Sequence, residues 1–397
     1  MKTYQDNGDS LKLLRAKIDQ CDNEIIELLD RRFELVREIG RYKASLNLPV
    51  SDGTREMQVL AQRAAKAPAR SCCFVENIFK LIISESCQVQ EEDRNAHAPS
   101  KFSYKKIAVV GLGLIGTSIC LALKKAKVDC KITGFDSNWT KAEQVLAMGA
   151  IDKLAHDLVD CVGQADLIVI AVPISAIKQV LMEIAPHVEY GTVIIDVGSS
   201  KEQVCQWMNS ILPQHTFFVG GHPLAGKTDT SVEAADENLF RQSLFVITPS
   251  KRTNTMAIRA ARQLINVIGA EEYVMPASVH DQQVAWVSHL PFLISACLVS
   301  TVTKHNMWPE AQKLAATGFY DTSRLSSGAA EMHTDICITN RDNILKALAS
   351  FRTVLTAVEE LILREDVDGL RSFFSIAKHE RDKWLSNVGK KREHDKI

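Results

Sequence analysis

One stretch decides the fold of this chain: Lys106-Ile107-Ala108-Val109-Val110-Gly111-Leu112-Gly113-Leu114-Ile115-Gly116-Thr117-Ser118. An apolar run leads into three glycines and then into an apolar helical pattern, which is the order of a strand, a tight turn and a helix N-terminus. Gly111 permits the turn, Gly113 lets the backbone approach a pyrophosphate, and Gly116 lets helix and strand pack closely. The pattern predicts a dinucleotide site on the helix N-terminus, formed by Gly111, Leu112, Gly113, Leu114, Ile115 and Gly116.

An acidic residue supports this interpretation. The next predicted strand, Lys131 to Phe135, ends in Asp136, which stands 25 positions after Gly111. An acid at this distance can accept hydrogen bonds from the adenosine ribose hydroxyls. The alternative is a glycine turn in some other α/β domain, but strand, helix and acid together favour a dinucleotide. Because a carboxylate repels a 2′-phosphate, the sequence predicts NAD over NADP, with Lys141 near enough in sequence to leave NADP open.

Composition bounds the class of protein. The chain has 397 residues, of which 46% are hydrophobic and 24% charged, with a net charge of -1; this is an ordinary globular composition with room for two or three domains. The balance of charges gives no sign of a nucleic acid or membrane partner. The sequence has no uninterrupted apolar run of about 18 residues, so no membrane-spanning helix is expected. Ten cysteines without C-x-x-C spacing predict a cytoplasmic protein without a metal site.

The first ninety residues predict three helices and no strand. Apolar residues recur at helical spacing over residues 11–46, and two further helices are expected over residues 54–65 and 72–90. A core this small often requires a partner chain for stability.

Several polar residues border the apolar side of these helices. Arg15, Arg32 and Lys43 lie three or four positions from apolar residues, and Ser86 and Gln90 add two neutral hydrogen-bonding groups four positions apart. Charges beside a core are costly unless they are paired. Their partners are either internal carboxylates or an anionic ligand such as a small dicarboxylate.

The N-terminal pattern resembles the all-helical chorismate mutases. The resemblance rests on Leu14-Arg15, Leu29-Asp30-Arg31-Arg32, Lys43, Pro49-Val50-Ser51-Asp52-Gly53-Thr54-Arg55-Glu56, Ser86 and Gln90. It implies a mutase domain over residues 1–90 that rearranges chorismate to prephenate in an intertwined homodimer, without a protein acid or base. It further implies that Lys43 and Gln90 face the ether oxygen, and that the substrate is bound by Arg15, Arg32, Asp52, Arg55, Glu56 and Ser86.

A linker over residues 91–104, which are polar and without periodicity, separates this region from alternating strands and helices over residues 105–275. The alternation predicts a doubly wound Rossmann sheet, whose ligands lie outside the carboxyl ends of its strands. Ser199 follows one of these strands, and His222 stands between glycines and a proline at the next. A lone histidine is usually structural, but at this edge His222 is also a catalytic candidate.

Residues 276–390 predict an all-helical region. A proline-interrupted apolar helix carries Ser288-His289-Leu290-Pro291, and a loop over residues 318–325 carries Arg324. A helical region after a nucleotide domain often closes the substrate cleft and supplies a dimer interface. The ordinary alternative for His289 and Arg324 is helix capping or surface pairing.

Four motifs in register resemble prephenate and arogenate dehydrogenases: Gly111-Leu112-Gly113-Leu114-Ile115-Gly116, Gly221-His222-Pro223-Leu224-Ala225-Gly226, Ser288-His289-Leu290-Pro291 and Gly318-Phe319-Tyr320-Asp321-Thr322-Ser323-Arg324. With its first domain, the chain resembles the bifunctional chorismate mutase–prephenate dehydrogenases of tyrosine synthesis. The resemblance implies an all-α mutase domain, an α/β Rossmann domain and an all-α C-terminal dimerisation domain. It also implies that His222 draws on the ring hydroxyl proton, that Ser199 supports His222, and that Arg324 and His289 meet the substrate.

The chain departs from this family pattern at two places. Phe292 stands where many relatives carry a second histidine, and Lys227 and Thr228 follow Gly226 where many carry threonine and an acid. These departures leave open tyrosine inhibition and the choice between prephenate and arogenate, which carries an amine in place of the side-chain keto group. Two further alternatives remain: an NAD-binding regulatory protein with an inactive site, and another hydroxyacid dehydrogenase, which would leave the first ninety residues unexplained.

Overall fold

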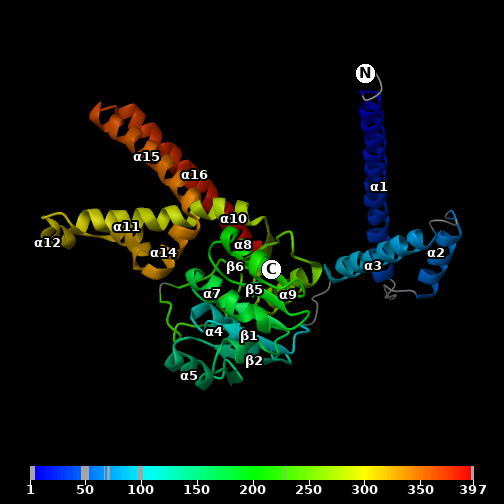
Figure 1. The fold of residues 1–397 in the computed structure, drawn as a ribbon. Helices are drawn as coiled ribbons and strands as arrows, with labels where there is room; N and C mark the ends of the chain where they lie inside the picture. Colours follow the sequence, from blue (N-terminus) through cyan, green and yellow to red (C-terminus); the bar gives the residue numbers. More distant parts are fainter. Residues whose placement is uncertain are drawn as a thin grey trace. The chain divides into compact units, whose positions relative to one another are not determined.

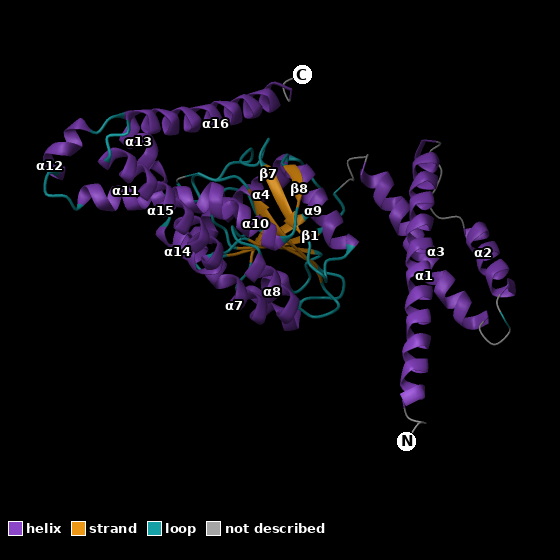
Figure 2. Ribbon diagram, turned by 90° about the horizontal axis from the view of Figure 1, so that it is seen from above, coloured by secondary structure: helices purple, strands orange, loops and turns teal. Residues whose placement is uncertain are grey.

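The computed structural model describes residues 5–45, 53–66, 68, 72–96, 102–227 and 229–394, and it divides into two compact units at Lys101 and Phe102. The first unit is helical, as predicted, with α1 and α2 both packed on α3 (Figure 2). The third helix runs six residues past Gln90, into the segment expected as a linker. The helices are α1 (Gln5–Ser45), α2 (Gly53–Lys66) and α3 (Cys72–Ala96).

Most of the apolar side of α1 is uncovered in a single chain. Val36 is buried, whereas Ile18, Leu28 and Leu35 are 59%, 65% and 53% exposed. Exposed apolar surface of this kind costs about 25 cal/mol per Å² relative to buried surface. The face predicted to form a core is therefore available to another surface.

A β-sheet forms the centre of the second unit (Figure 1). It has eight strands, in the order β3-β2-β1-β4-β5-β6-β7-β8. All neighbouring strands are parallel except β6 and β7. The strand order reverses at β1 and β4, which is where a doubly wound sheet binds its ligand. The strands are β1 (Lys106–Val110), β2 (Lys131–Phe135), β3 (Lys153–Leu154), β4 (Leu167–Ile170), β5 (Val193–Asp196), β6 (Phe217–Pro223), β7 (Leu244–Thr248) and β8 (Glu271–Val274).

Helices cover both faces of this sheet, which confirms the predicted Rossmann fold. One apolar core joins the sheet to α4, α5 and α9, and a second joins it to α6, α7 and α8. The sheet is therefore buried on both faces, as parallel sheets are. The helices are α4 (Leu114–Lys125), α5 (Trp139–Ala147), α6 (Leu158–Val162), α7 (Ile174–Ile184), η1 (Ala185–His187), α8 (Glu202–Ile211) and α9 (Thr255–Ile268).

The rest of the unit is helical and packs on the α7 and α8 side of the sheet. Phe292, Ile336 and Ile344 belong to the same buried core as those two helices. Asp335 adds a polar tie, because its Oδ2 accepts hydrogen bonds from the N–H and the hydroxyl of Ser175 at 2.9 and 2.8 Å. The elements are α10 (Ala277–Val284), η2 (Ala285–His289), α11 (Leu290–Thr303), α12 (Trp308–Ala311), η3 (Gln312–Leu314), α13 (Thr317–Ser323), η4 (Arg324–Ser327), α14 (Ala330–Thr339), α15 (Arg341–Leu363) and α16 (Val367–His394).

Two local expectations in this helical region were wrong. Residues 318–325 form α13 and the start of η4, not a loop, and the Thr322 hydroxyl donates to the Gly318 carbonyl one turn earlier at 2.8 Å. Pro291 does not interrupt its helix, because η2 is a π-helical turn that leads directly into α11. Such turns absorb a residue that cannot donate a backbone hydrogen bond.

The continuous helical stretch Ala277–Thr303 is long and apolar enough to cross a membrane, by length and composition alone. No such stretch was expected, because polar residues interrupt its apolar run. Three of those residues are buried within the protein: His280, Asp281 and His289 are each 1% exposed. One face of the stretch therefore packs inside the second unit, and 33% of its most apolar window is buried.

The glycine-rich turn between β1 and α4 has the predicted geometry. Gly111 has a φ of +96°, and a Cβ added at Gly116 would lie 2.0 Å from the Gly111 carbonyl oxygen. No side chain fits at that distance, so the close approach of helix and strand requires glycine.

Replacing Gly116 should therefore separate α4 from β1. For Gly116→Ala we expect a loss of about 1–3 kcal/mol in the free energy of unfolding, the usual cost of overpacking, together with weaker dinucleotide binding. Urea unfolding followed by circular dichroism measures the first quantity. Gly318→Ala is the matched control, since no heavy atom lies within 4 Å of its added Cβ; equal losses in both variants would contradict the argument.

Candidate active sites

The carboxyl edge of the sheet brings the predicted dinucleotide residues together. Asp136 Oδ2 accepts a hydrogen bond from Leu112 N at 2.8 Å, and its Oδ1 accepts one from Asn138 N at 2.9 Å. Asp136 is thus fixed against the glycine-rich turn. Gly113 caps α4 without a side-chain hydrogen bond, so the helix presents backbone N–H groups suited to a phosphate.

Lys141 also reaches this site. Its Nζ lies 3.5 Å from Asp136 Oδ2 and 3.6 Å from the position of a Cβ at Gly113. The turn therefore combines a carboxylate suited to a ribose with an ammonium group suited to a phosphate.

His222 lies at the end of β6, and its ring contacts a second histidine. His222 Nδ1 is 2.8 Å from His280 Nε2, and His280 Nδ1 is 2.7 Å from Asp281 Oδ1. His280 and Asp281 belong to α10 and were not predicted. Their signal in the sequence was an adjacent pair of titratable residues at the start of an apolar helix.

Asp281 also holds the N-terminus of α8. Its Oδ1 accepts from Lys201 N at 2.7 Å, and its Oδ2 accepts from Glu202 N at 2.9 Å. A carboxylate at a helix N-terminus satisfies unpaired N–H groups and interacts favourably with the helix dipole. This contact fixes α10 to the Rossmann region.

A buried ion pair lies beneath His222. Lys201 and Asp196 are both 0% exposed, and Lys201 Nζ donates to the Asp196 carboxylate. The same Nζ donates to the Gly221 carbonyl at 2.7 Å, which ties the ends of β5 and β6 together. This pair was also missed; its signal was a lysine directly after two serines at a strand end. Breaking such a pair costs about 3–5 kcal/mol, because one charge remains buried and unpaired.

These surroundings keep both predicted histidines neutral near pH 7. Burial lowers the pKa of His222 well below 6.5, and the neighbouring His280, Lys201 and His289 lower it further. Burial lowers the pKa of His289 to about 4, with His280 and His333 acting in the same direction and Asp281 opposing them. A neutral imidazole has one nitrogen lone pair with which to accept a proton.

His289 and the divergent Phe292 lie in the same neighbourhood. His289 Nδ1 is 3.2 Å from Asn340 Nδ2, which also donates to the Asp281 carbonyl at 2.7 Å. The ring of Phe292 stacks on His333 with centroids 4.1 Å apart and planes at 2°. The imidazole of His333 on α14 therefore lies beside position 292, where this chain has phenylalanine and not histidine.

Ser199 and Arg324 have less defined surroundings. Ser199 is half-buried after β5, and the adjacent Ser200 hydroxyl lies 2.7 Å from that of Thr339. Arg324 begins η4 and is exposed. The contact shown by the His222 ring is with His280, so the support expected from Ser199 stays a prediction, as does the substrate contact of Arg324.

The first unit assembles part of the other predicted site. Arg32 on α1 donates to the hydroxyl of Ser86 on α3, which in turn donates to the Ile82 carbonyl. Burial and the neighbouring charge of Arg63 lower the pKa of Arg32. Two cations held close together leave positive potential for an anionic ligand.

The remaining predicted residues of this unit are partly outside the description. Arg15 and Arg55 are exposed, and Lys43 is half-buried. Asp52 lies outside the described residues, and Glu56 and Gln90 lie in α2 and α3 with side chains that the structure does not describe. Their roles stay predictions.

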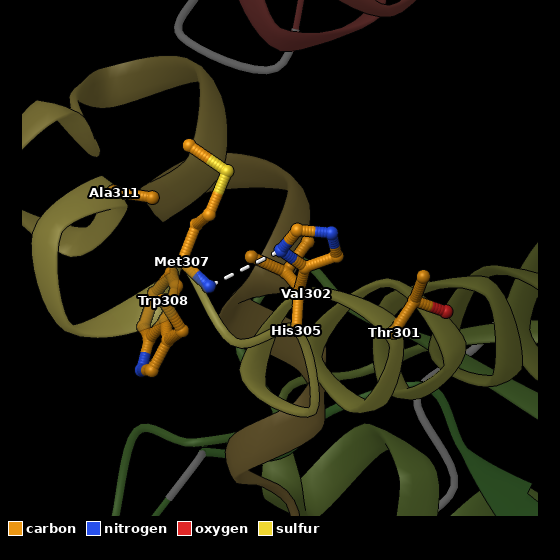
Figure 3. A pocket seen from close by; sticks show the side chains of 6 residues that line it. All are labelled: Thr301, Val302, His305, Met307, Trp308 and Ala311. Carbon is orange, nitrogen blue, oxygen red and sulfur yellow. Dashed lines mark hydrogen bonds between the residues drawn. The ribbon is translucent and has the colours of Figure 1, made fainter.

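A surface pocket of about 220 Å³ lies elsewhere, at the end of α11 (Figure 3), where Met307 N donates to His305 Nδ1 at 3.2 Å. None of the predicted site residues lines it. Within the described ranges, no group of three histidine, cysteine or acidic side chains is arranged to hold a metal ion. The pocket is lined by Thr301, Val302, His305, Met307, Trp308 and Ala311.

Family models match three successive parts of the chain. Chorismate mutase type II matches residues 14–91, the nucleotide-binding domain of prephenate dehydrogenase matches 119–274, and the dimerization domain of prephenate dehydrogenase matches 276–376. The prephenate dehydrogenase of Bacillus subtilis (strain 168) is 34% identical over 278 residues, which are 70% of this chain and 75% of that protein. The chain belongs to the prephenate dehydrogenase family.

Further relatives match at larger extent or in three dimensions. The T-protein of Haemophilus influenzae is 22% identical over 344 residues, covering 85% of this chain and 83% of its own. Prephenate dehydrogenase from A. aeolicus, solved with hydroxyphenyl propionate and NAD+, has a TM-score of 0.67 at 27% identity and covers 71% of this chain and 98% of its own. Synechocystis arogenate dehydrogenase has a TM-score of 0.61 at 30% identity, covering 70% and 99%.

The matches decide among the alternatives raised by the sequence. The chain unites a chorismate mutase with an NAD-dependent prephenate dehydrogenase of tyrosine biosynthesis. The three family matches account for the first ninety residues, which another hydroxyacid dehydrogenase would leave unexplained, and an arogenate dehydrogenase is not favoured. The nucleotide-binding match begins after the glycine-rich turn, so the assignment of that turn rests on its own geometry.

Proposed function

We propose that His222 is the group of the dehydrogenase that draws on the ring hydroxyl proton of prephenate while hydride leaves the carbinol carbon for NAD. The observation that carries this proposal is a neutral imidazole at the carboxyl edge of the sheet, hydrogen-bonded through Nδ1 and with its pKa lowered by burial. Its side chain keeps some exposed surface, as a group that meets a substrate requires.

The stoichiometry defines how much this base must do. Prephenate and NAD give 4-hydroxyphenylpyruvate, carbon dioxide and NADH, and the equation balances in atoms and charge without a released proton. Hydride takes the electron pair of the carbinol C–H bond, while the pair of the breaking C–CO₂ bond makes the ring aromatic. His222 therefore needs only to polarise the hydroxyl by accepting a hydrogen bond from it. The proton either stays on the hydroxyl oxygen or returns to it.

Three other residues of the dehydrogenase are assigned by likeness to the family. Arg324 binds a substrate carboxylate, and His289 supplies a further polar contact, held through Nδ1 by Asn340. Ser199 supports the His222–substrate contact. Protonation at low pH removes the lone pair of His222, whereas the guanidinium of Arg324 acts only as a hydrogen-bond donor.

Paired kinetics of two variants test these roles. His222→Asn should lower kcat by about 10²–10⁴-fold with little change in KM, because the lost interaction matters in the transition state. Arg324→Ala should mainly raise KM, since a carboxylate contact exists before and during reaction. In the unaltered enzyme, kcat/KM should be constant at neutral pH and fall as pH drops through the His222 pKa, well below 6.5. Normal kcat in His222→Asn would show that this histidine is structural.

Asp136 is proposed to bind the adenosine ribose and to favour NAD over NADP. Its carboxylate occupies the place of a 2′-phosphate and repels its charge. Lys141, 3.5 Å from that carboxylate, moderates the repulsion, so NADP is a poor substrate and not an excluded one.

Nucleotide preference tests this pair. Asp136→Ser should lower the NAD:NADP ratio of kcat/KM by about tenfold, equivalent to 1.4 kcal/mol. Adding Lys141→Met to that variant should reverse part of the change, because the remaining cation is removed. An unaltered enzyme that prefers NADP, or a ratio unaffected by Asp136→Ser, would contradict the proposal.

The mutase is proposed to act as a homodimer in the cytoplasm, with chorismate bound by Arg32 and the other predicted polar residues. The uncovered apolar side of α1 supports pairing of two chains there, and the C-terminal match to a dimerization domain supports pairing in the dehydrogenase. The described cysteines are all free, as in a reducing compartment. Sedimentation of the intact protein at the mass of one chain would contradict pairing.

Independence of the two chemistries is a direct consequence. Arg32→Ala should abolish conversion of chorismate, because the variant loses both the cation proposed to bind a substrate carboxylate and the contact with Ser86. Oxidation of supplied prephenate should remain nearly normal, because His222 and the glycine-rich turn lie in the other unit. A parallel loss of both activities in folded protein would show that the two reactions share residues.

A further inference from the structure

We propose that His280 and Asp281 are positioning residues that fix the tautomer of His222, so that His222 Nε2 carries the lone pair that meets the substrate hydroxyl. The inference rests on the proposed role of His222 and extends it to the α10 helix. The geometry is a continuous hydrogen-bonded line of three side chains, two of them only 1% exposed.

The direction of the line is set at Asp281. Both of its carboxylate oxygens accept backbone N–H groups, from Lys201 at 2.7 Å and Glu202 at 2.9 Å. Because backbone N–H donors point at both of its oxygens, this carboxylate accepts hydrogen bonds and does not donate them. The 2.7 Å contact with His280 Nδ1 therefore requires the hydrogen to be on His280 Nδ1.

The same logic passes through the second ring. A neutral imidazole with hydrogen on Nδ1 has its lone pair on Nε2, so His280 Nε2 accepts and His222 Nδ1 donates across the 2.8 Å contact. This leaves the lone pair of His222 on Nε2. With His280 neutral, the reverse direction would require Asp281 to donate a proton while both of its oxygens face N–H donors.

The tautomer of His222 matters because the ring is neutral and cannot rotate freely to exchange its two nitrogens. Its ring is fixed edge-to-face against His280, with centroids 5.0 Å apart and planes at 79°. In the other neutral tautomer, Nε2 would present hydrogen to the substrate hydroxyl and could accept nothing. Loss of the carboxylate that sets a catalytic histidine's tautomer costs about 10⁴ in kcat in the Ser-His-Asp triad.

Two replacements of His280 separate orientation from packing. His280→Gln retains an amide oxygen that can reach the place of Nε2 and accept from His222, whereas His280→Phe retains a ring and loses the acceptor. We expect His280→Phe to lower kcat by about 10²-fold or more and His280→Gln to recover most of that loss, with similar KM for NAD. Nitrogen-15 NMR of labelled histidine, with the His222 signals assigned by their loss in His222→Asn, should show Nδ1 protonated and Nε2 unprotonated in the unaltered enzyme and in His280→Gln. His280→Phe should shift the population toward protonated Nε2.

Asp335→Asn is the control for docking. Asp335 also joins the helical region to a helix of the Rossmann region, but no histidine is attached to it, so kcat and the His222 tautomer should be unchanged. A protonated Nε2 on His222 in the unaltered enzyme overturns the proposal. Equal losses of kcat in the two His280 variants overturn it as well, as does a loss of kcat in Asp335→Asn as large as that in His280→Phe. If the tautomer is as stated but His222→Asn is fully active, the orientation stands and the role proposed for His222 fails.

Discussion

The carboxylate of Asp281 joins the two halves of the dehydrogenase at the point where its chemistry is proposed. It accepts hydrogen bonds from two backbone N–H groups at the start of α8, and it contacts the ring of the preceding residue, His280. Docking of the helical region and orientation of the histidines are therefore one interaction. A change that moved α10 away from α8 would also remove the partner that holds the His222 ring.

The same physical chemistry recurs at three helices along this edge of the sheet. The N-terminus of α8 is satisfied by Asp281, and that of α7 by Asp335 through Ser175. Gly113 leaves the N-terminus of α4 without a side-chain cap. Anions are stabilised at all three ends, but two are occupied by carboxylates of the chain and one is suited to the pyrophosphate of a nucleotide. The difference between a structural and a ligand-binding helix end is thus whether the chain supplies its own anion.

Features that depend on neighbours in sequence could be predicted, and features that depend on distant pairing could not. The glycine-rich turn and Asp136 each follow a strand, and His222 lies at the end of one. The patterns of these strands are local, and the structure brings the turn and Asp136 together as expected. His280 contacts His222 across 58 positions and Asp281 contacts Lys201 across 80, which no local pattern encodes. The expectation of a loop over residues 318–325 was wrong, because Gly318 is the second residue of α13 and does not end that helix.

The buried pair of Lys201 and Asp196 shows why stability and reactivity are coupled in this site. Removing two charges from water costs several kcal/mol per ion before their attraction is counted, and an apolar pair would fill the space without that cost. The lysine, however, also bonds the Gly221 carbonyl and contributes a positive charge that lowers the pKa of His222. Asp196 balances that charge so that it can be buried at all. The pair therefore fixes the strand end that carries His222 and disfavours the imidazolium form, which is the protonation state in which the proposed reaction cannot begin.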